Sequence, residues 1–322
     1  MARVIRSRTV LTAAAVAAVL ALVAGLTAVQ ASPRPDLPRV EPARLIASSL
    51  RAVASRTPVS GTVQTHVDLG LPQLPGMADP TCPLSALVVD SRFRVWRSPD
   101  GVRVAQLLPF GECDAVANAT DAWFWNADRF AAWHAFAPPG AETAPMLPSL
   151  GDLTDLVGTA LERLAPSADV SLADPVEVAG RDAYVVRLSP PAGTDTLIGR
   201  VDVAIDAETR LPLRLRVVPK GSDAAAIEAG FTSVAFDPID PSMFDFAPPP
   251  GAEVTEVHAD ALEPHDRASG SAMPDVRVLG RGFGLVLAVR VPTADVPREA
   301  ASALPYAGPL GSADLVERGD HA

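Results

Sequence analysis

The chain lacks the side-chain groupings by which many enzymes are recognised. Its five histidines are scattered along the sequence: His66, His134, His258, His265 and His321. None of them belongs to an H-E-x-x-H zinc motif. The sequence also contains no G-x-S-x-G nucleophile motif, no phosphate-binding P-loop and no dinucleotide fingerprint. We therefore expect a protein that is not an enzyme and that uses no cofactor and no metal.

The tryptophans are the more informative chemical feature. All four lie in one short stretch, as Trp96, Trp123, Trp125 and Trp133. Trp123 and Trp125 are two residues apart, so on a β-strand they share one face. Such a cluster indicates either an ordinary core patch or the wall of an apolar pocket. The two interpretations are compatible, because a curved sheet whose concave face is not filled by side chains leaves a cavity.

Cys82 and Cys113 are the only cysteines. In an exported domain an even number of cysteines indicates a disulfide, which here would close a loop of about 30 residues. The alternative is a pair of buried free thiols. Neither cysteine has a Cys or His neighbour at a ligand spacing, so a metal site is not indicated.

The N-terminus has the composition of an export signal. Three arginines precede the uncharged apolar stretch 11–29, and Ala31 completes a small-residue site that suits a signal peptidase. The apolar stretch also approaches the length of a membrane span. Residues 1–31 are therefore either a cleaved signal peptide or a retained membrane anchor. Both alternatives place residues 32–322 outside the cytoplasm, beginning with a proline-rich spacer at 32–40.

Composition excludes two further classes of protein. The chain has 322 residues, of which 48% are hydrophobic, so it can bury a large core and is not globally disordered. Its net charge is −11, from 27 Lys and Arg against 38 Asp and Glu. A nucleic-acid-binding protein needs a basic footprint on the phosphates, so nucleic acid is not an expected partner.

Hydrophobic periodicity predicts two helices and a series of short strands. The apolar stripes of residues 42–54 and 149–164 have helical spacing. Alternating or apolar runs predict strands at 59–71, 84–89, 93–97, 102–108, 114–117, 122–125, 130–136, 181–188, 197–205, 211–217 and 227–236, with one further strand-like run at 276–292. The connections are too short for parallel crossovers. We therefore predict an α+β fold: a strongly curved antiparallel half-barrel of about ten strands, with helices covering its concave face.

This arrangement predicts a possible apolar cavity between the sheet and the helices. We expect the apolar faces of strands 59–71, 122–125, 197–205 and 211–217 to line one concave surface. If the helices seal onto it, the result is an ordinary core; if a gap remains, it is a site for an acyl chain. The candidate ligand-binding residues are Val63, Val67, Trp96, Trp123, Trp125, Leu153, Val157, Leu161, Val203 and Leu213.

Residues 203–254 resemble the end of the LolA-like domains of exported actinobacterial proteins. The resemblance rests on a turn with Asp206 and Thr209, on the Leu-Pro pair that opens the next strand, and on a Pro-x-x-Phe-x-Phe-x-Pro-Pro-Pro-Gly run at 241–251. The sequence SGTV at the first long strand and the tryptophan strand DAWFWNA also fit. The resemblance covers a domain at 41–255, followed by an acidic linker at 256–274 and a C-terminal extension at 275–322.

The resemblance implies a half-barrel that binds lipid. The family includes lipoprotein carriers, which hold acyl chains between sheet and helices, and RseB-like periplasmic regulators of envelope stress. We therefore expect an extracytoplasmic lipid- or lipoprotein-binding protein. The alternative is a membrane-anchored envelope-stress regulator that contacts an anti-sigma factor or another membrane partner. A structural envelope domain without a ligand is a third possibility.

Overall fold

The computed structural model describes residues 35–68, 90–109, 111–136, 153–258, 275–279, 282–284, 286–290, 306–307 and 312–313. The chain divides into two compact units, Met1–Arg34 and Pro35–Ala322, and every described residue belongs to the second. The predicted signal or anchor at 1–31, the strand at 84–89 and the linker from residue 259 onward lie outside the described residues. Among the residues that are described, no helix is long and apolar enough to cross a membrane.

The described elements follow the predicted order closely. The two α-helices are α2 (Pro42–Ala54) and α3 (Leu153–Leu164). The strands of the main sheet are β1 (Val59–Val67), β2 (Ser91–Ser98), β3 (Gly101–Leu107), β4 (Glu112–Ala117), β5 (Asp121–Asn126), β6 (Ala131–Phe136), β7 (Asp169–Val178), β8 (Arg181–Ser189), β9 (Ile198–Asp206), β10 (Pro212–Pro219), β11 (Ile227–Ala235) and β12 (Glu253–His258). Short 3-10 turns occur at Ala165–Ser167 (η3), Pro241–Phe244 (η4) and Gly282–Gly284 (η6).

These strands form one open, curved half-barrel in the order β12-β6-β5-β4-β3-β2-β1-β11-β10-β9-β8-β7. Every neighbouring pair is antiparallel except β12 and β6, which are parallel. The predicted α+β half-barrel is confirmed. The sheet has twelve strands rather than about ten, because β7 and β12 were not expected from the sequence.

The C-terminal segment differs from its prediction. Residues 276–292 were expected to form one strand-like run, but they contain the hairpin β13 (Asp275–Leu279) and β14 (Val286–Arg290). The run contains three glycines at 280, 282 and 284, and Gly282 has a positive φ, so the run cannot stay extended. A second small pair, β15 (Tyr306–Ala307) and β16 (Ser312–Ala313), follows. Strand β12 extends past residue 255, where the predicted domain ended.

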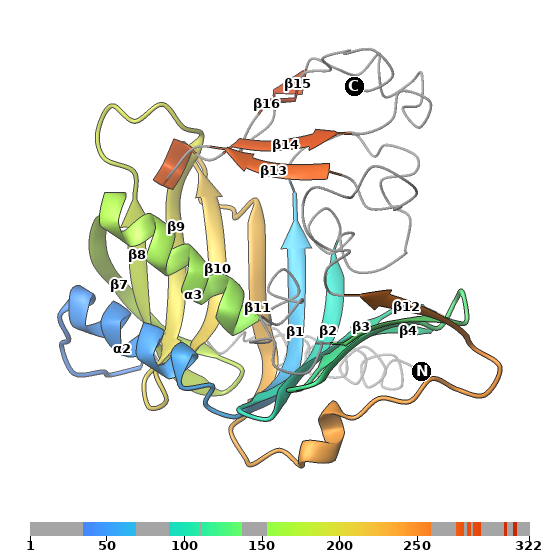
Figure 1. Cartoon of the computed structure of the whole chain (residues 1–322). Coiled ribbons are helices and arrows are strands. Elements are labelled where there is room, and N and C mark those ends of the chain that lie inside the picture. The colour runs from blue at the N-terminus through green and yellow to red at the C-terminus, as the bar shows by residue number, and fades with distance from the viewer. Residues whose placement is uncertain are drawn as a thin grey trace, which may run out of the picture. The chain divides into compact units, whose positions relative to one another are not determined.

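The two helices pack against one face of the sheet. Figure 1 shows α2 and α3 in front of strands β7 to β10. Pro42 stands in the first turn of α2, a position that proline favours, and Leu45 and Ile46 are buried on one side of that helix. Helix α2 contacts α3 and β7, and α3 contacts β10. The apolar stripes of both helices therefore close one side of the core.

Strand register assigns each side chain to one of the two faces. Val63 of β1 lies opposite Phe93 of β2 and Phe231 of β11, and all three belong to the core beneath the helices. We call the face that carries them the helix side. Gln64, the next residue of β1, lies opposite Gly230, which in turn lies opposite Arg214 of β10. The face that carries Gln64 and Arg214 is the opposite side.

Candidate functional site

Five of the predicted cavity residues meet on the helix side. Val63, Val203 and Leu213 come from three strands, and Val157 and Leu161 come from α3. Each is at most 4% exposed, and all belong to one apolar cluster. The prediction that these segments share a surface with α3 is therefore met. In the structure this surface is covered by side chains, so ligand binding there stays a prediction.

Two other predicted cavity residues lie at the ends of their elements. Val67 lies at the end of β1 and is partly buried, on the same face as Val63. Leu153 is the first residue of α3, and its side chain lies outside what the structure describes. The predicted helix began at 149, and residues 149–152 are likewise outside the described part of the chain.

The three tryptophans of the predicted site lie on the opposite side of the sheet. Trp123 of β5 lies opposite Val116 of β4, Val116 lies opposite Arg103 of β3, and Arg103 lies opposite Trp96 of β2. Residues that lie directly opposite each other share a face, so Trp123 and Trp96 are on the same side of the sheet. Trp96 precedes a residue of the helix side, so its own side chain points away from the helices. Trp125 shares this face with Trp123. The expectation that strand 122–125 presents its tryptophans to the same surface as Val63 is therefore wrong.

On the opposite side, the tryptophans form an aromatic cluster with residues from distant parts of the chain. The ring of Trp123 stacks on His134 with centroids 3.9 Å apart, and it lies 5.5 Å from Phe246. Trp125 also neighbours Phe246, which belongs to the proline-rich run after η4. By the same register, Trp133 of β6 is the one tryptophan on the helix side. The cluster therefore fastens the segment after η4 onto the sheet.

A buried arginine joins the two helices to the sheet. Arg97 of β2 is 1% exposed, and its Nη2 donates to the Val53 carbonyl near the end of α2. The same nitrogen lies 3.0 Å from the Asp155 carboxylate in the first turn of α3. Sequence reasoning missed this contact, because nothing in the strand pattern marks Arg97 as buried.

The predicted disulfide is only half described. Cys113 lies in β4 on the helix side and is 3% exposed. Cys82 lies outside the described residues, so its pairing with Cys113 stays a prediction.

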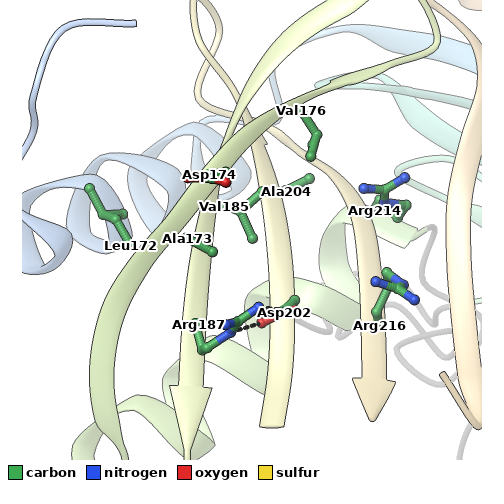
Figure 2. Close-up of a pocket in the computed structure, with 10 residues that line it drawn as sticks. All are labelled: Leu172, Ala173, Asp174, Val176, Val185, Arg187, Asp202, Ala204, Arg214 and Arg216. Atoms are coloured by element: carbon green, nitrogen blue, oxygen red, sulfur yellow. Dashed lines mark hydrogen bonds and ion pairs between the residues drawn. The ribbon is translucent and has the colours of Figure 1, made fainter. Parts of the chain in front are cut away.

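The opposite side carries a polar pocket of about 420 Å³. Its walls come from β7, β8, β9 and β10, as Figure 2 shows. The lining residues are Leu172, Ala173, Asp174, Val176, Val185, Arg187, Asp202, Ala204, Arg214 and Arg216. Arg187 holds Asp202 in a two-pronged ion pair, with distances of 2.7 Å from Nε and 2.9 Å from Nη2. Sequence reasoning missed this pocket, because its walls depend on which strands are neighbours in the sheet.

A second pocket of about 300 Å³ adjoins the first through Arg214. It is lined by residues of β1, β7, β10 and β11, including His66 and Glu228. Glu228 accepts a hydrogen bond of 3.0 Å from Nε of Arg216. His66 is exposed, and its Nδ1 lies 2.9 Å from a carboxylate oxygen of Asp90. That hydrogen bond and the charge of Asp90 raise the pKa of His66 above its ordinary value.

Within the described ranges, no three His, Cys, Asp or Glu side chains are grouped so that they could hold a metal ion. Two His–Asp pairs are present: His66 with Asp90, and His134 with Asp121, where the distance is 2.7 Å. Sequence reasoning had treated these histidines as isolated, because Asp90 is 24 residues from His66 along the chain. In each pair the carboxylate orients the ring.

Comparison with known proteins finds structures but no sequence relatives. No family model matches the chain, and no curated protein matches it. A solved structure of the MucA/MucB complex of Pseudomonas aeruginosa is 14% identical, with 86% of this chain and 100% of that chain covered and a TM-score of 0.42. Lipoprotein LppX of Mycobacterium tuberculosis is 11% identical, with coverages of 64% and 100% and a TM-score of 0.35.

A LolA superfamily protein of Nitrosomonas europaea is 8% identical, with coverages of 65% and 99% and a TM-score of 0.25. Because all three TM-scores are below 0.5, the function has to come from the residues of this chain.

Proposed function

We propose that the protein is an extracytoplasmic lipid- or lipoprotein-binding module that holds acyl chains between the helices and the helix side of the sheet. The observation that supports this most directly is the apolar layer under α2 and α3. Val63, Val203 and Leu213 form the sheet side of this layer, and Val157 and Leu161 form its helix α3 side. An acyl chain gains about 0.8 kcal/mol for each CH₂ group that it buries in such a layer, so no catalytic group is needed.

The two helices pack closely against each other. A Cβ atom placed on Gly158 of α3 would lie only 3.1 Å from Cγ1 of Val53 in α2, so the two helices are in close contact. Arg97 holds this pair to β2 at Val53 and Asp155. Elsewhere the layer is held mainly by apolar contacts, which an acyl chain can replace with contacts of its own. We propose that the helices part from the sheet around the Arg97 contact to admit the ligand.

The same proposal includes export of residues 32–322. The alternative function is that of an anchored regulator that contacts an anti-sigma factor or another membrane partner. Retention of residues 11–29 as an anchor would support this alternative. Determining the N-terminal residue of the protein recovered from cells distinguishes the two. A mature chain that begins at Ser32 favours a free carrier, and an intact N-terminus favours the regulator.

The test of lipid binding uses the full-length protein and a pair of matched variants. Val203→Thr adds one hydroxyl to the helix side, and Val116→Thr adds the same group to a buried position on the opposite side, outside both pockets. A fluorescent fatty acid is titrated into each protein, and thermal unfolding checks the fold. We expect saturable binding by the wild type, weakened about three- to tenfold by Val203→Thr, since an unpaired hydroxyl is costly in an apolar site. Val116→Thr should leave affinity unchanged.

Mass spectrometry of lipid extracted from the purified protein supplies a second measurement, independent of any variant. We expect an acyl-bearing lipid in roughly stoichiometric amount. If the wild type shows no saturable binding and carries no lipid, the helix side is only a packed core and the proposal is wrong. Equal weakening by both variants would also contradict it.

A further inference from the structure

The opposite side of the sheet presents an arginine that is not engaged by the protein itself. Arg214 lies in the middle of β10 and lines both pockets. Its neighbour Arg216 is paired with Glu228, and Arg187 is paired with Asp202. Within the part of the chain that the structure describes, Arg214 itself forms no hydrogen bond and no ion pair. Its five N–H donors are therefore available to a ligand.

Small residues on the two neighbouring strands hold Arg214 in this position. Gly230 of β11 and Ala204 of β9 lie directly opposite Arg214. A Cβ atom on Gly230 would lie 2.9 Å from Cγ of Arg214 and 3.3 Å from its Cβ and Cδ. The aliphatic part of Arg214 thus occupies the space that a side chain at residue 230 would fill. Figure 2 shows Arg214 and Arg216 projecting from the same strand beside the Arg187–Asp202 pair.

The electrostatic surroundings leave the Arg214 cation poorly compensated. Burial lowers the pKa of Arg214, and the neighbouring charge of Arg216 lowers it further. Glu228 and Asp202 act in the other direction, but each already accepts hydrogen bonds from another arginine. Arginine stays protonated in proteins, so a positive charge remains in the pocket. An anion that reached it would supply the missing compensation.

Beside the three arginines, Asp202 and the carboxylate of Asp174, the remaining lining residues of the pocket are apolar. Val176 and Val185 contribute aliphatic side chains, and the small residues Ala173 and Ala204 leave space beside them. A volume of about 420 Å³ falls within the ordinary range of small-molecule sites. A lone inorganic ion would leave these walls uncovered, whereas an anion with a short aliphatic group would use both parts of the pocket.

We propose that this pocket binds a small amphipathic oxyanion, an organic carboxylate or phosphate ester, whose charged group is held by Arg214. Its apolar part lies against Val176 and Val185. The site is separate from the acyl-chain layer, because it lies on the other face of the sheet. An arginine fork suits planar carboxylates and phosphate oxygens alike, so the two chemistries are distinguished by experiment.

The test is calorimetric titration of the full-length protein with hexanoate, hexyl phosphate and inorganic phosphate. We expect saturable binding of hexanoate or hexyl phosphate, and which one binds more tightly identifies the charged group. Inorganic phosphate should bind at least tenfold more weakly than the better of the two. If it binds equally well, the apolar wall contributes nothing and the amphipathic ligand is wrong. If none of the three binds in the millimolar range, there is no site.

Three variants locate the binding. Arg214→Gln should weaken it about tenfold or more, since a charge-assisted hydrogen bond is lost. Arg94→Gln removes an exposed arginine from β2, outside both pockets, and should change nothing. Gly230→Ala keeps the arginine but displaces its stem, so it should also weaken binding. Unchanged affinity in Arg214→Gln, or an equal loss in Arg94→Gln, would overturn the proposal; if Gly230→Ala fails to fold, the two arginine variants decide alone.

Discussion

Two arginines on opposite faces of the sheet are used in contrasting ways. Arg97 is buried under the helices, and its guanidinium contacts the Val53 carbonyl and the Asp155 carboxylate. Arg214 lies in an open pocket and, among the described residues, has no such contact. The first charge holds elements of the protein together, and the second remains free to hold something else.

The difference extends to the surfaces around these residues. On the helix side, apolar side chains from strands and helices fill the space between them. On the opposite side, charged residues line an open pocket along β7 to β10, and an aromatic cluster covers part of β5. A ligand of the helix side must displace packed groups, whereas a ligand of the opposite side needs only to displace water.

The largest expected effect on stability compares Val63 and Gln64, adjacent residues of β1 that lie on different faces of the sheet. Val63→Asp places a carboxylate in the packed layer under the helices and should reduce the free energy of unfolding by about 3–5 kcal/mol. Gln64→Asp places the same group on the exposed opposite side and should change it by less than about 0.5 kcal/mol. Denaturant unfolding measures both. A loss below about 1 kcal/mol for Val63→Asp would show that water already reaches the helix side.

The next effect compares the two arginines directly. Arg97→Gln removes a buried charge and leaves the Val53 carbonyl and Asp155 without this donor, so we expect a loss of about 2–4 kcal/mol in the free energy of unfolding. Arg214→Gln removes no intramolecular hydrogen bond in the described structure and should leave the stability unchanged or slightly higher. Thermal and denaturant unfolding of both variants decide this. Comparable losses would mean that Arg214 is structural.

A third comparison concerns a paired charge on the opposite side. Asp206 is 0% exposed and accepts hydrogen bonds from Arg181, at 2.9 and 3.0 Å, and from Thr209. We expect Asp206→Asn to cost about 2–4 kcal/mol of stability at pH 7. Asp223, which is fully exposed beside Arg200, is the matched control, and Asp223→Asn should have no measurable effect.

The pH dependence of the Asp206 effect has a defined sign. Burial raises the pKa of Asp206, but the hydrogen bonds from Arg181 and Thr209 outweigh it and leave the pKa below its ordinary value. The stabilisation is therefore complete above the pKa of an unfolded aspartate, about 3.9, and is lost as the pH falls through the folded value. The stability difference between wild type and Asp206→Asn should shrink in acid. A difference that stays constant between pH 7 and pH 3 would exclude this role.

The smallest expected effect concerns the pKa of His66, which lies at the exposed rim of the second pocket. The hydrogen bond and charge of Asp90 raise the pKa of His66, so an NMR titration should place it above 6.5. Asp90→Asn should return it toward the ordinary value. The pair stabilises the folded state below the unfolded histidine pKa, and this contribution disappears as the pH rises through the folded pKa. A pKa at or below 6.5 in the wild type would show that the pair does not form in solution.

The sequence was sufficient for the local parts of the fold. The residues of α2 match the predicted range, and the strands predicted at 93–97 and 102–108 correspond to β2 and β3, which pair directly with each other. Helical stripes, alternating strands and turn residues are short-range signals, and short-range signals can be read without an alignment. The Asp206 and Thr209 turn, which carried part of the family resemblance, also proves to be a hydrogen-bonded unit.

What could not be predicted depends on partners far away in the chain. Strand β7 was missed because Pro175 interrupts its pattern, and the strand accommodates it where the register shifts between Ala173 and Val176. Strand β12 was missed because it pairs in parallel with β6, more than a hundred residues earlier. The face on which Trp123 lies can be assigned only by following the strand pairings from β5 back to β1. The Arg214 pocket can be found only once β9, β10 and β11 are known to be neighbours.

The open half-barrel has a consequence for how the protein behaves when concentrated. An unclosed sheet presents two terminal strands whose free backbone groups could recruit strands of other molecules. Here one border is β7, where Pro175 removes an N–H donor and the irregular register interrupts the ladder. The other border is β12, whose Glu253 and Glu256 are exposed. Both borders therefore discourage further strand addition, so the sheet can remain unclosed without becoming a template for aggregation.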